Sequence, residues 1–168
     1  MKGSFDDILP ESISPESEAI LLDHLKRKLK VAASVMVDLF HAFEEHYGDE
    51  ARDILHELAA RTYPQRPNVG EPKQDLHAFC DGLDSACAGT HQWERVTEEP
   101  DRIAYRYTRC MWAEVFRELG EPELGYLWCA SDEPAAQAYN PRLGFERTKL
   151  LMHGDGECDH IFYVAEAD

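Results

Sequence analysis

The N-terminal part of the chain carries apolar residues at intervals of three and four. Between residues 15 and 47 this spacing predicts one long amphipathic helix. Ser14 can serve as its N-cap, Pro15 suits the first helical position, and Gly48 follows its end. Extra apolar residues widen the stripe, so we expect this helix to be covered on more than one side, which makes it a candidate surface for homo-oligomer formation. The repeating positions are Leu22, Leu25, Leu29, Ala32, Met36, Phe40, Phe43 and Tyr47.

Two further helices are predicted before the pattern changes. Asp49 can cap a second helix, whose apolar stripe runs through residues 51–58 and which Pro64 and Pro67 close. A third and less regular helix is expected over residues 74–87.

After Gly89 the helical spacing of apolar residues is replaced by alternation of residues between two faces, as in a strand. Residues 93–97 and 103–108 alternate around a turn at 98–101, which is typical of a β-hairpin. A short helix is expected over residues 111–119, ending at a glycine.

The last quarter of the chain predicts a second hairpin preceded by another short helix. Residues 132–139 form that helix, and an Asn-Pro pair ends it. Alternation over residues 145–153, a turn at Gly154-Asp155-Gly156 and a returning strand from residue 158 to residue 164 make the hairpin. The fold class is therefore α+β, with N-terminal helices packed on an antiparallel sheet of about four strands, built from two hairpins linked by short helices.

Length and composition fit one domain and restrict its partners. We expect an N-terminal tail over residues 1–15 and a single α+β domain over residues 16–168. The chain has 33 acidic and 17 basic residues, a formal charge of −16, which disfavours nucleic acid and anionic membrane surfaces. Because of this net negative charge, an anionic substrate needs a cationic side chain at its binding site.

The cellular compartment and the redox state of the cysteines are predicted from features that the sequence lacks. There is no apolar run of about 18 residues, and the first residues lack an apolar signal core, so a cytoplasmic protein is expected. Five cysteines without dense spacing favour free thiols over disulfides. The sequence contains neither Cys-x-x-Cys nor His-Glu-x-x-His, and we expect no metal and no cofactor.

Cys110 and Glu114 are the first candidates for chemistry. Cys110 stands where a strand ends and a helix begins, and the free backbone N–H groups there can lower a thiol pKa. Glu114 lies one helical turn further on and would then transfer protons. The alternatives are a buried, inert Cys110 and a surface carboxylate.

Cys129 and Asp132 come together if a helix begins between them. A carboxylate raises a neighbouring thiol pKa, so the pair suits a nucleophile with a general acid, or two ligands; the alternative is a helix cap beside a buried thiol. The types at Cys129, Asp132, His153 and Cys158 also suit zinc or iron, although their spacing is long.

Arg147 interrupts an alternating strand on the same side as Phe145. An inward guanidinium must be paired, either with an internal carboxylate such as Asp132 or Glu114, or with the carboxylate of a ligand. Asn140 adds an amide that can orient an oxygen.

These residues belong to a longer ordered series in the C-terminal third of the chain. The series is Cys110 and Glu114, Leu119-Gly120-x-Pro122-Glu123-Leu124, Cys129-x-x-Asp132, Asn140-Pro141-x-Leu143-x-Phe145-x-Arg147-Thr148, Gly154 and Cys158-Asp159. Over residues 105–165 it resembles the L-2-amino-thiazoline-4-carboxylic acid hydrolase family. The resemblance implies a small enzyme of cysteine metabolism that opens the ring of 2-amino-thiazoline-4-carboxylate with water, giving a carbamoyl-cysteine.

The resemblance implies a hydrolase acting on a non-peptide carbon–nitrogen bond, with a small carboxylate as its partner. Cys110 or Cys129 would be the nucleophile, and Glu114 and Asp132 the proton-transfer groups. The substrate would be held by Asn140, Arg147 and His153.

A second resemblance supports a different class of function. The ending Gly154-Asp155-Gly156-Glu157-Cys158 is similar to that of 4-vinyl-reductase and hydrocarbon-sensor domains. Where the metal-binding sensors have a Glu and a second Cys, this chain has Arg147 and Leu150, which argues against their zinc site. The alternative function is therefore a non-catalytic small-molecule binding or sensor domain, with or without zinc.

Overall fold

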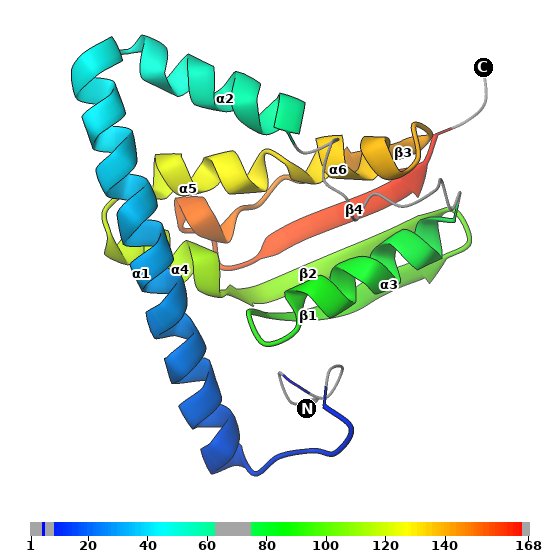
Figure 1. Ribbon diagram of the computed structural model, residues 1–168. Coiled ribbons are helices and arrows are strands. Elements are labelled where there is room, and N and C mark those ends of the chain that lie inside the picture. Colours follow the sequence, from blue (N-terminus) through cyan, green and yellow to red (C-terminus); the bar gives the residue numbers. More distant parts are fainter. Residues whose placement is uncertain (1–4, 6–8, 63–74, 166–168) are drawn as a thin grey trace.

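The computed structural model describes residue 5 and residues 9–62 and 75–165 of the chain (Figure 1). Pro64 and Pro67, predicted to close the second helix, lie outside these residues, as do residue 74 at the predicted start of the third helix and residues 1–4 and 6–8 of the predicted N-terminal tail. In the described part of the chain, no helix is long and apolar enough to cross a membrane.

The N-terminal helices confirm the helical periodicity. Helix α1 (Pro15–Tyr47) begins at Ser14, whose side chain accepts a hydrogen bond from the Ser17 N–H at 3.2 Å. Gly48 ends it with φ of 63°, a backbone conformation that glycine adopts without strain. Helix α2 (Glu50–Thr62) follows at once and packs on α1, as the short connection requires.

One antiparallel sheet carries the rest of the fold, with strand order β1-β2-β4-β3. The strands are β1 (His91–Glu99), β2 (Arg102–Cys110), β3 (Leu143–Glu146) and β4 (Cys158–Val164). The first predicted hairpin is present as β1 and β2, and the strands of the second are present as the antiparallel pair β3 and β4, which β4 joins to the first by pairing with β2. The four-stranded α+β prediction is confirmed.

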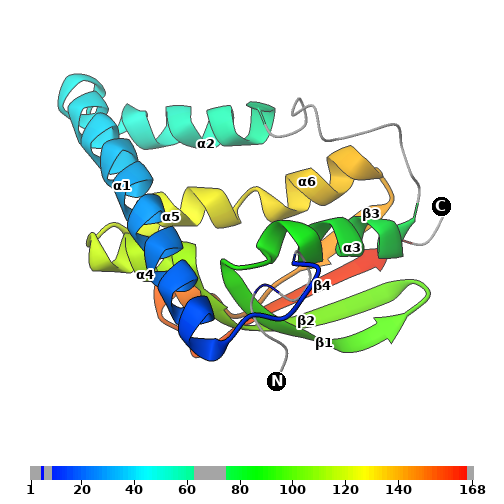
Figure 2. The same cartoon turned by 60° about the horizontal axis from the view of Figure 1, so that its bottom comes forward.

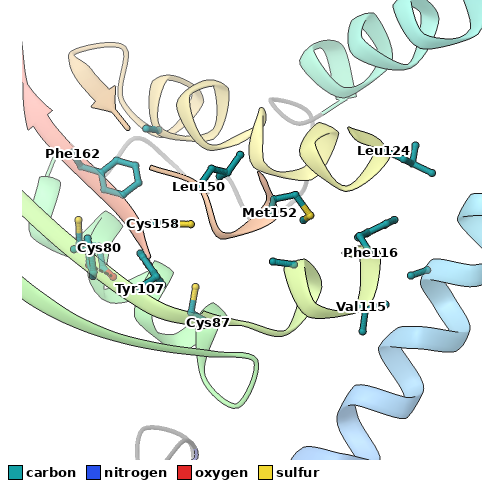
Figure 3. Close-up of a cluster of buried hydrophobic side chains, with 14 of the residues drawn as sticks. Cys80, Cys87, Tyr107, Val115, Phe116, Leu124, Leu150, Met152, Cys158 and Phe162 are labelled. Atoms are coloured by element: carbon teal, nitrogen blue, oxygen red, sulfur yellow. Dashed lines mark hydrogen bonds between the residues drawn. The ribbon is translucent and has the colours of Figure 1, made fainter. Parts of the chain in front are cut away.

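The helices lie mainly on one face of that sheet, as Figure 2 shows. Helices α3 (Leu76–Cys87) and α6 (Asp132–Tyr139) cover it. Helix α4 (Met111–Glu118) joins β2 to α5 (Pro122–Cys129) at one end and packs against α1, while α5 packs on α4, α2 and residues 151–153. The buried faces of these elements form one core between the helices and the sheet (Figure 3). The largest fully buried side chains include Tyr105, Phe116, Leu76, Ile103 and Phe162.

Two elements differ from the predicted pattern. Helix α5 was not predicted, although Pro122 at its first position and Glu123 in its first turn are typical of a helix start. The strand predicted to reach residue 153 ends at Glu146, because carboxylates bind the backbone beyond it. Asp159 accepts hydrogen bonds from the N–H groups of residues 148 and 149 at 2.8 and 2.5 Å, and Asp155 accepts one from residue 150 at 2.6 Å, before a 3-10 turn at residues 151–153.

Gly125 allows α5 to approach the core closely. A Cβ atom at this position would lie 2.6 Å from the Met152 sulfur and 2.7 Å from the Phe116 ring. We expect Gly125→Ala to lower the free energy of unfolding by about 1–3 kcal/mol through overpacking. Gly82→Ala in α3 is the matched control, since nothing lies within 4 Å of its added methyl group and it should stabilise by about 0.5–1 kcal/mol. Urea unfolding of both variants measures the difference; equal changes would contradict the packing argument.

Candidate functional site

Several element ends converge at the helix-covered face of the sheet. Cys110 ends β2, Cys158 begins β4, Cys129 ends α5, Asp132 begins α6, and Arg147 follows β3. Arg147 bonds to Asp132 and to the Cys129 carbonyl oxygen, and Asp132 lies near enough to all three thiols to add to the rise that burial causes in their pKa values. We call these five residues the thiol–carboxylate cluster. Four of its residues are those that the sequence predicts as catalytic or substrate-binding. The fifth is Cys158, which the sequence offers only as a candidate metal ligand.

The Asp132–Arg147 ion pair is the central contact of the cluster. Arg147 Nη1 donates to Asp132 Oδ2 at 2.6 Å and to the Cys129 carbonyl oxygen at 3.2 Å. The guanidinium also lies over the Phe145 ring, 5.4 Å from its centre. The Arg147 side chain is only 10% exposed and that of Asp132 is 27% exposed, so the pair is mostly enclosed and part of the Asp132 side chain meets solvent. Of the two pairings predicted for Arg147, the structure shows the internal one.

The protein environment tunes the carboxyl group of Asp132 towards neutrality. Burial raises the pKa of Asp132 to about 6, and the adjacent Arg147 guanidinium opposes part of that rise. A carboxyl group with this pKa exists in both protonation states near neutral pH. It can therefore accept and return a proton within one reaction cycle.

The thiols of the cluster are held in the neutral form. Cys110 is the N-cap of α4, and its sulfur accepts the Ala113 N–H at 3.5 Å, but burial outweighs this effect and raises the pKa of Cys110 to about 11. Burial and the nearby Asp132 raise the pKa of Cys129. Burial also raises the pKa of Cys158, whose sulfur accepts the Leu151 N–H at 3.1 Å. None of the three is an activated thiolate in this structure.

Two buried polar groups beside the cluster were not predicted from the sequence. Among the described residues, Tyr107 Oη and His160 Nε2 are buried and have no hydrogen-bond partner of good geometry, although the Tyr107 hydroxyl lies near enough to the Cys87 thiol to offset part of the rise that burial causes in the Cys87 pKa. The Tyr107 and His160 rings lie 4.7 Å apart, and Figure 3 shows Tyr107 close to Cys87. Burial, with Arg147 nearby, lowers the pKa of His160 to about 3, so its imidazole is neutral. Unsatisfied buried polar atoms of this kind are typical of ligand or water positions.

Glu114 lies outside the cluster, on the side of α4 that faces α1. It accepts hydrogen bonds from Arg109 Nε at 2.6 Å and Nη2 at 3.2 Å, and pairs with Lys26 at 2.9 Å. The hydrogen bonds from Arg109 lower the pKa of Glu114. The structure thus places this carboxylate in an interhelix ion-pair network, away from the thiol–carboxylate cluster.

Asn140 and His153 also lie away from the cluster. Asn140 is buried at the opposite end of α6 from Asp132, where its Oδ1 accepts the Arg142 N–H at 2.9 Å and closes the turn into β3. His153 is 43% exposed and packs on the Tyr126 ring, with centroids 5.0 Å apart.

The suggested metal set of Cys129, Asp132, His153 and Cys158 therefore does not assemble, because His153 turns to the surface. Over residues 9–62 and 75–165, no group of three or more His, Cys, Asp or Glu side chains has an arrangement that could hold a metal ion.

Comparisons with known proteins show the family of the chain and a likeness of fold. The model of the family described as L-2-amino-thiazoline-4-carboxylic acid hydrolase matches residues 28–162, which include the whole cluster and extend well beyond the C-terminal motifs. No curated protein matches the chain. The fold is similar to a crystal structure of the phenol-responsive sensory domain of the transcription activator PoxR with phenol. The TM-score is 0.51 at 9% identity, over 77% of this chain and 73% of that one, a likeness of fold.

Proposed function

Because the chain belongs to the L-2-amino-thiazoline-4-carboxylic acid hydrolase family, we propose that it hydrolyses a small cyclic amidine or thiazoline of the 2-amino-thiazoline-4-carboxylate type. The observation that carries the proposal is the Asp132–Arg147 pair. A carboxyl group with a pKa of about 6 lies 2.6 Å from an enclosed guanidinium, within reach of solvent. This combination provides a proton-transfer group beside a binding group for a carboxylate.

In the proposed reaction, water adds to ring carbon C2 across its non-peptide carbon–nitrogen double bond. The ionised Asp132 accepts a proton from the water as the new carbon–oxygen bond forms. The carbon–sulfur bond of the ring then breaks, and Asp132 returns its proton to the departing thiolate. One proton of the water ends on the ring nitrogen and the other on the sulfur, giving a carbamoyl-cysteine.

Arg147 is the proposed binding group for the substrate carboxylate. Both of its hydrogen bonds use Nη1, and among the described residues no acceptor bonds to Nε or Nη2. Those two nitrogens can form a bidentate pair with a carboxylate. Because the whole protein has a formal charge of −16, a local guanidinium is needed to attract an anionic substrate.

We assign the attack to water rather than to a thiolate. Cys110 and Cys129 are the nucleophile candidates, yet burial raises both of their pKa values, which keeps the thiols protonated at neutral pH. The neutral thiols instead line the site with polarisable, weakly polar surface. Tyr107 Oη can donate a hydrogen bond to the ring nitrogen of the substrate, and His160 Nε2 can accept one from its amino group.

A non-catalytic ligand-binding function is the second candidate. The fold is similar to that of a phenol-responsive sensory domain, and Tyr107 and His160 are buried polar groups that a bound small molecule can satisfy. In this reading the Asp132–Arg147 pair anchors the ligand and no bond is broken.

Incubation with 2-amino-thiazoline-4-carboxylate distinguishes the two functions. Hydrolysis releases one free thiol per substrate, which a chromogenic thiol reagent detects against a substrate-free control that accounts for the five cysteines of the protein. Multiple turnovers are expected for the hydrolase. Saturable binding in equilibrium dialysis without thiol release would refute catalysis and support the second function.

A further inference from the structure

Helix α1 presents a second apolar face that no other described element covers. Its inner side buries Ala33, Val37 and Phe40 against the rest of the fold. On its other side, five aliphatic side chains are between 43% and 67% exposed and share an arc of about 100° on the helix. Figures 1 and 2 both show α1 at an edge of the molecule. We call it the outer face of α1; it consists of Ile20, Leu21, Val31, Val35 and Leu39.

The charges along α1 are segregated by position. Residues 26–30 hold Lys26, Arg27, Lys28 and Lys30, four of the 17 basic residues of the chain. Further along the helix come Asp38, Glu44 and Glu45. Lys26 and Lys30 pair with carboxylates of α4, and Arg27 pairs with Asp23 of the same helix. The exposed Lys28 is therefore the cation of this segment that can attract a second copy of a protein with a formal charge of −16. Two such helices side by side attract when antiparallel and repel when parallel.

We propose that two copies of this protein dimerise through the outer face of α1, with their helices antiparallel and the two-fold axis at the level of residue 33. This register places Val31 opposite the partner's Val35 and Lys28 opposite the partner's Asp38, twice by symmetry. All four residues are exposed in the isolated subunit.

The size of the contact supports a stable dimer. Residues 20–46 extend along about 40 Å of helix. A contact of this length with an aliphatic centre and a charged rim can reach the roughly 1,000 Å² that specific dimers bury. The face lies on the side of α1 away from α4, so it does not compete with the packing that holds the thiol–carboxylate cluster.

Sedimentation of the full chain tests the dimer with a matched pair of variants. Val35 on α1 and Val96 on β1 are equally exposed, at 53%. The wild type is expected to sediment as a dimer. Val35→Glu should raise the dimer dissociation constant at least 100-fold, because two carboxylates face the apolar centre, while Val96→Glu leaves it unchanged. A monomeric wild type, or a dimer that tolerates Val35→Glu, overturns the proposal.

A charge exchange tests the antiparallel register. Lys28→Glu and Asp38→Lys should each weaken the dimer at least tenfold, and the double variant should regain most of the wild-type affinity, since each pair is re-formed with reversed signs. Two single losses without recovery overturn the register. Circular dichroism confirms that α1 stays helical in each variant. A monomeric wild type that binds anionic vesicles through Val35 would assign the face to a membrane surface and also refute the proposal.

Discussion

Replacement of Asp132 by Asn is expected to lower kcat/KM for 2-amino-thiazoline-4-carboxylate by about 100- to 10,000-fold, the range that a general base contributes. The amide keeps the shape of the side chain and can still accept the Arg147 hydrogen bond, which is 2.6 Å long in the wild type. It cannot accept a proton from water. Thiol release under saturating and limiting substrate separates the effect on kcat from that on KM.

The pH dependence provides an independent check on the same residue. The wild-type rate should rise with pH through about 6, since the ionised carboxylate is the base. Stability should change in the opposite direction. The folded-state pKa of Asp132 lies above its ordinary 3.8, so the native state binds this proton more tightly, and the resulting stabilisation is lost as pH rises from about 4 to about 6. Asp132→Asn should lack this loss.

Two neighbouring substitutions serve as controls for Asp132. Glu133→Gln removes an exposed carboxylate from the next position of α6, where it accepts a hydrogen bond from Gln137, and should leave kcat/KM within about twofold. Cys129→Ser should retain most activity, because water and not this thiol attacks the substrate. An inactive Cys129→Ser enzyme with an active Asp132→Asn enzyme would reverse the assignment.

The elements that the sequence predicts correctly are those whose information is local. The three-and-four spacing of α1 and the alternation of β1 and β2 each extend over enough residues to define a period. Helix α5 is as long as the correctly predicted helices α4 and α6, but its first position is a proline that follows Gly120 closely, a combination that also resembles a chain break. The early end of β3 depends on Asp159, eleven residues from the Thr148 N–H that it binds, and no local pattern reports such a bond.

The candidate site also has features that the sequence predicts and features that only the fold shows. The ordered motifs in the C-terminal third bring together Cys110, Cys129, Asp132 and Arg147, which the fold gathers from different element ends. Alternation along β4 puts His160 on the side of Cys158, but only the packed structure shows that its imidazole lacks a partner. Glu114 pairs with Lys26 and Arg109, neither of which lies on its helix. Sequence spacing therefore could not show that these two residues hold Glu114 away from the thiol–carboxylate cluster.

Replacement of Arg147 by Met is expected to affect binding, ionisation and stability together. It removes the group that opposes the rise in the Asp132 pKa, so the midpoint of the pH–rate profile should move above about 6. It also removes the proposed carboxylate clamp, so KM should rise by about 10- to 100-fold at a pH where Asp132 is ionised. Loss of a partly enclosed charged hydrogen bond should lower the free energy of unfolding by about 1–3 kcal/mol.

Three comparisons separate these effects of Arg147. Arg142→Met removes an exposed guanidinium that bonds to a backbone carbonyl near the end of β4, and should leave KM and the pH profile unchanged. Arg147→Lys keeps the charge and should preserve the pH midpoint, while losing the bidentate contact and therefore affinity. An Asp132→Asn/Arg147→Met enzyme should lose less transition-state stabilisation than the sum of the single variants, because the pair acts as one unit. Full additivity, with an unmoved pH midpoint in Arg147→Met, would show that the guanidinium does not control the Asp132 proton.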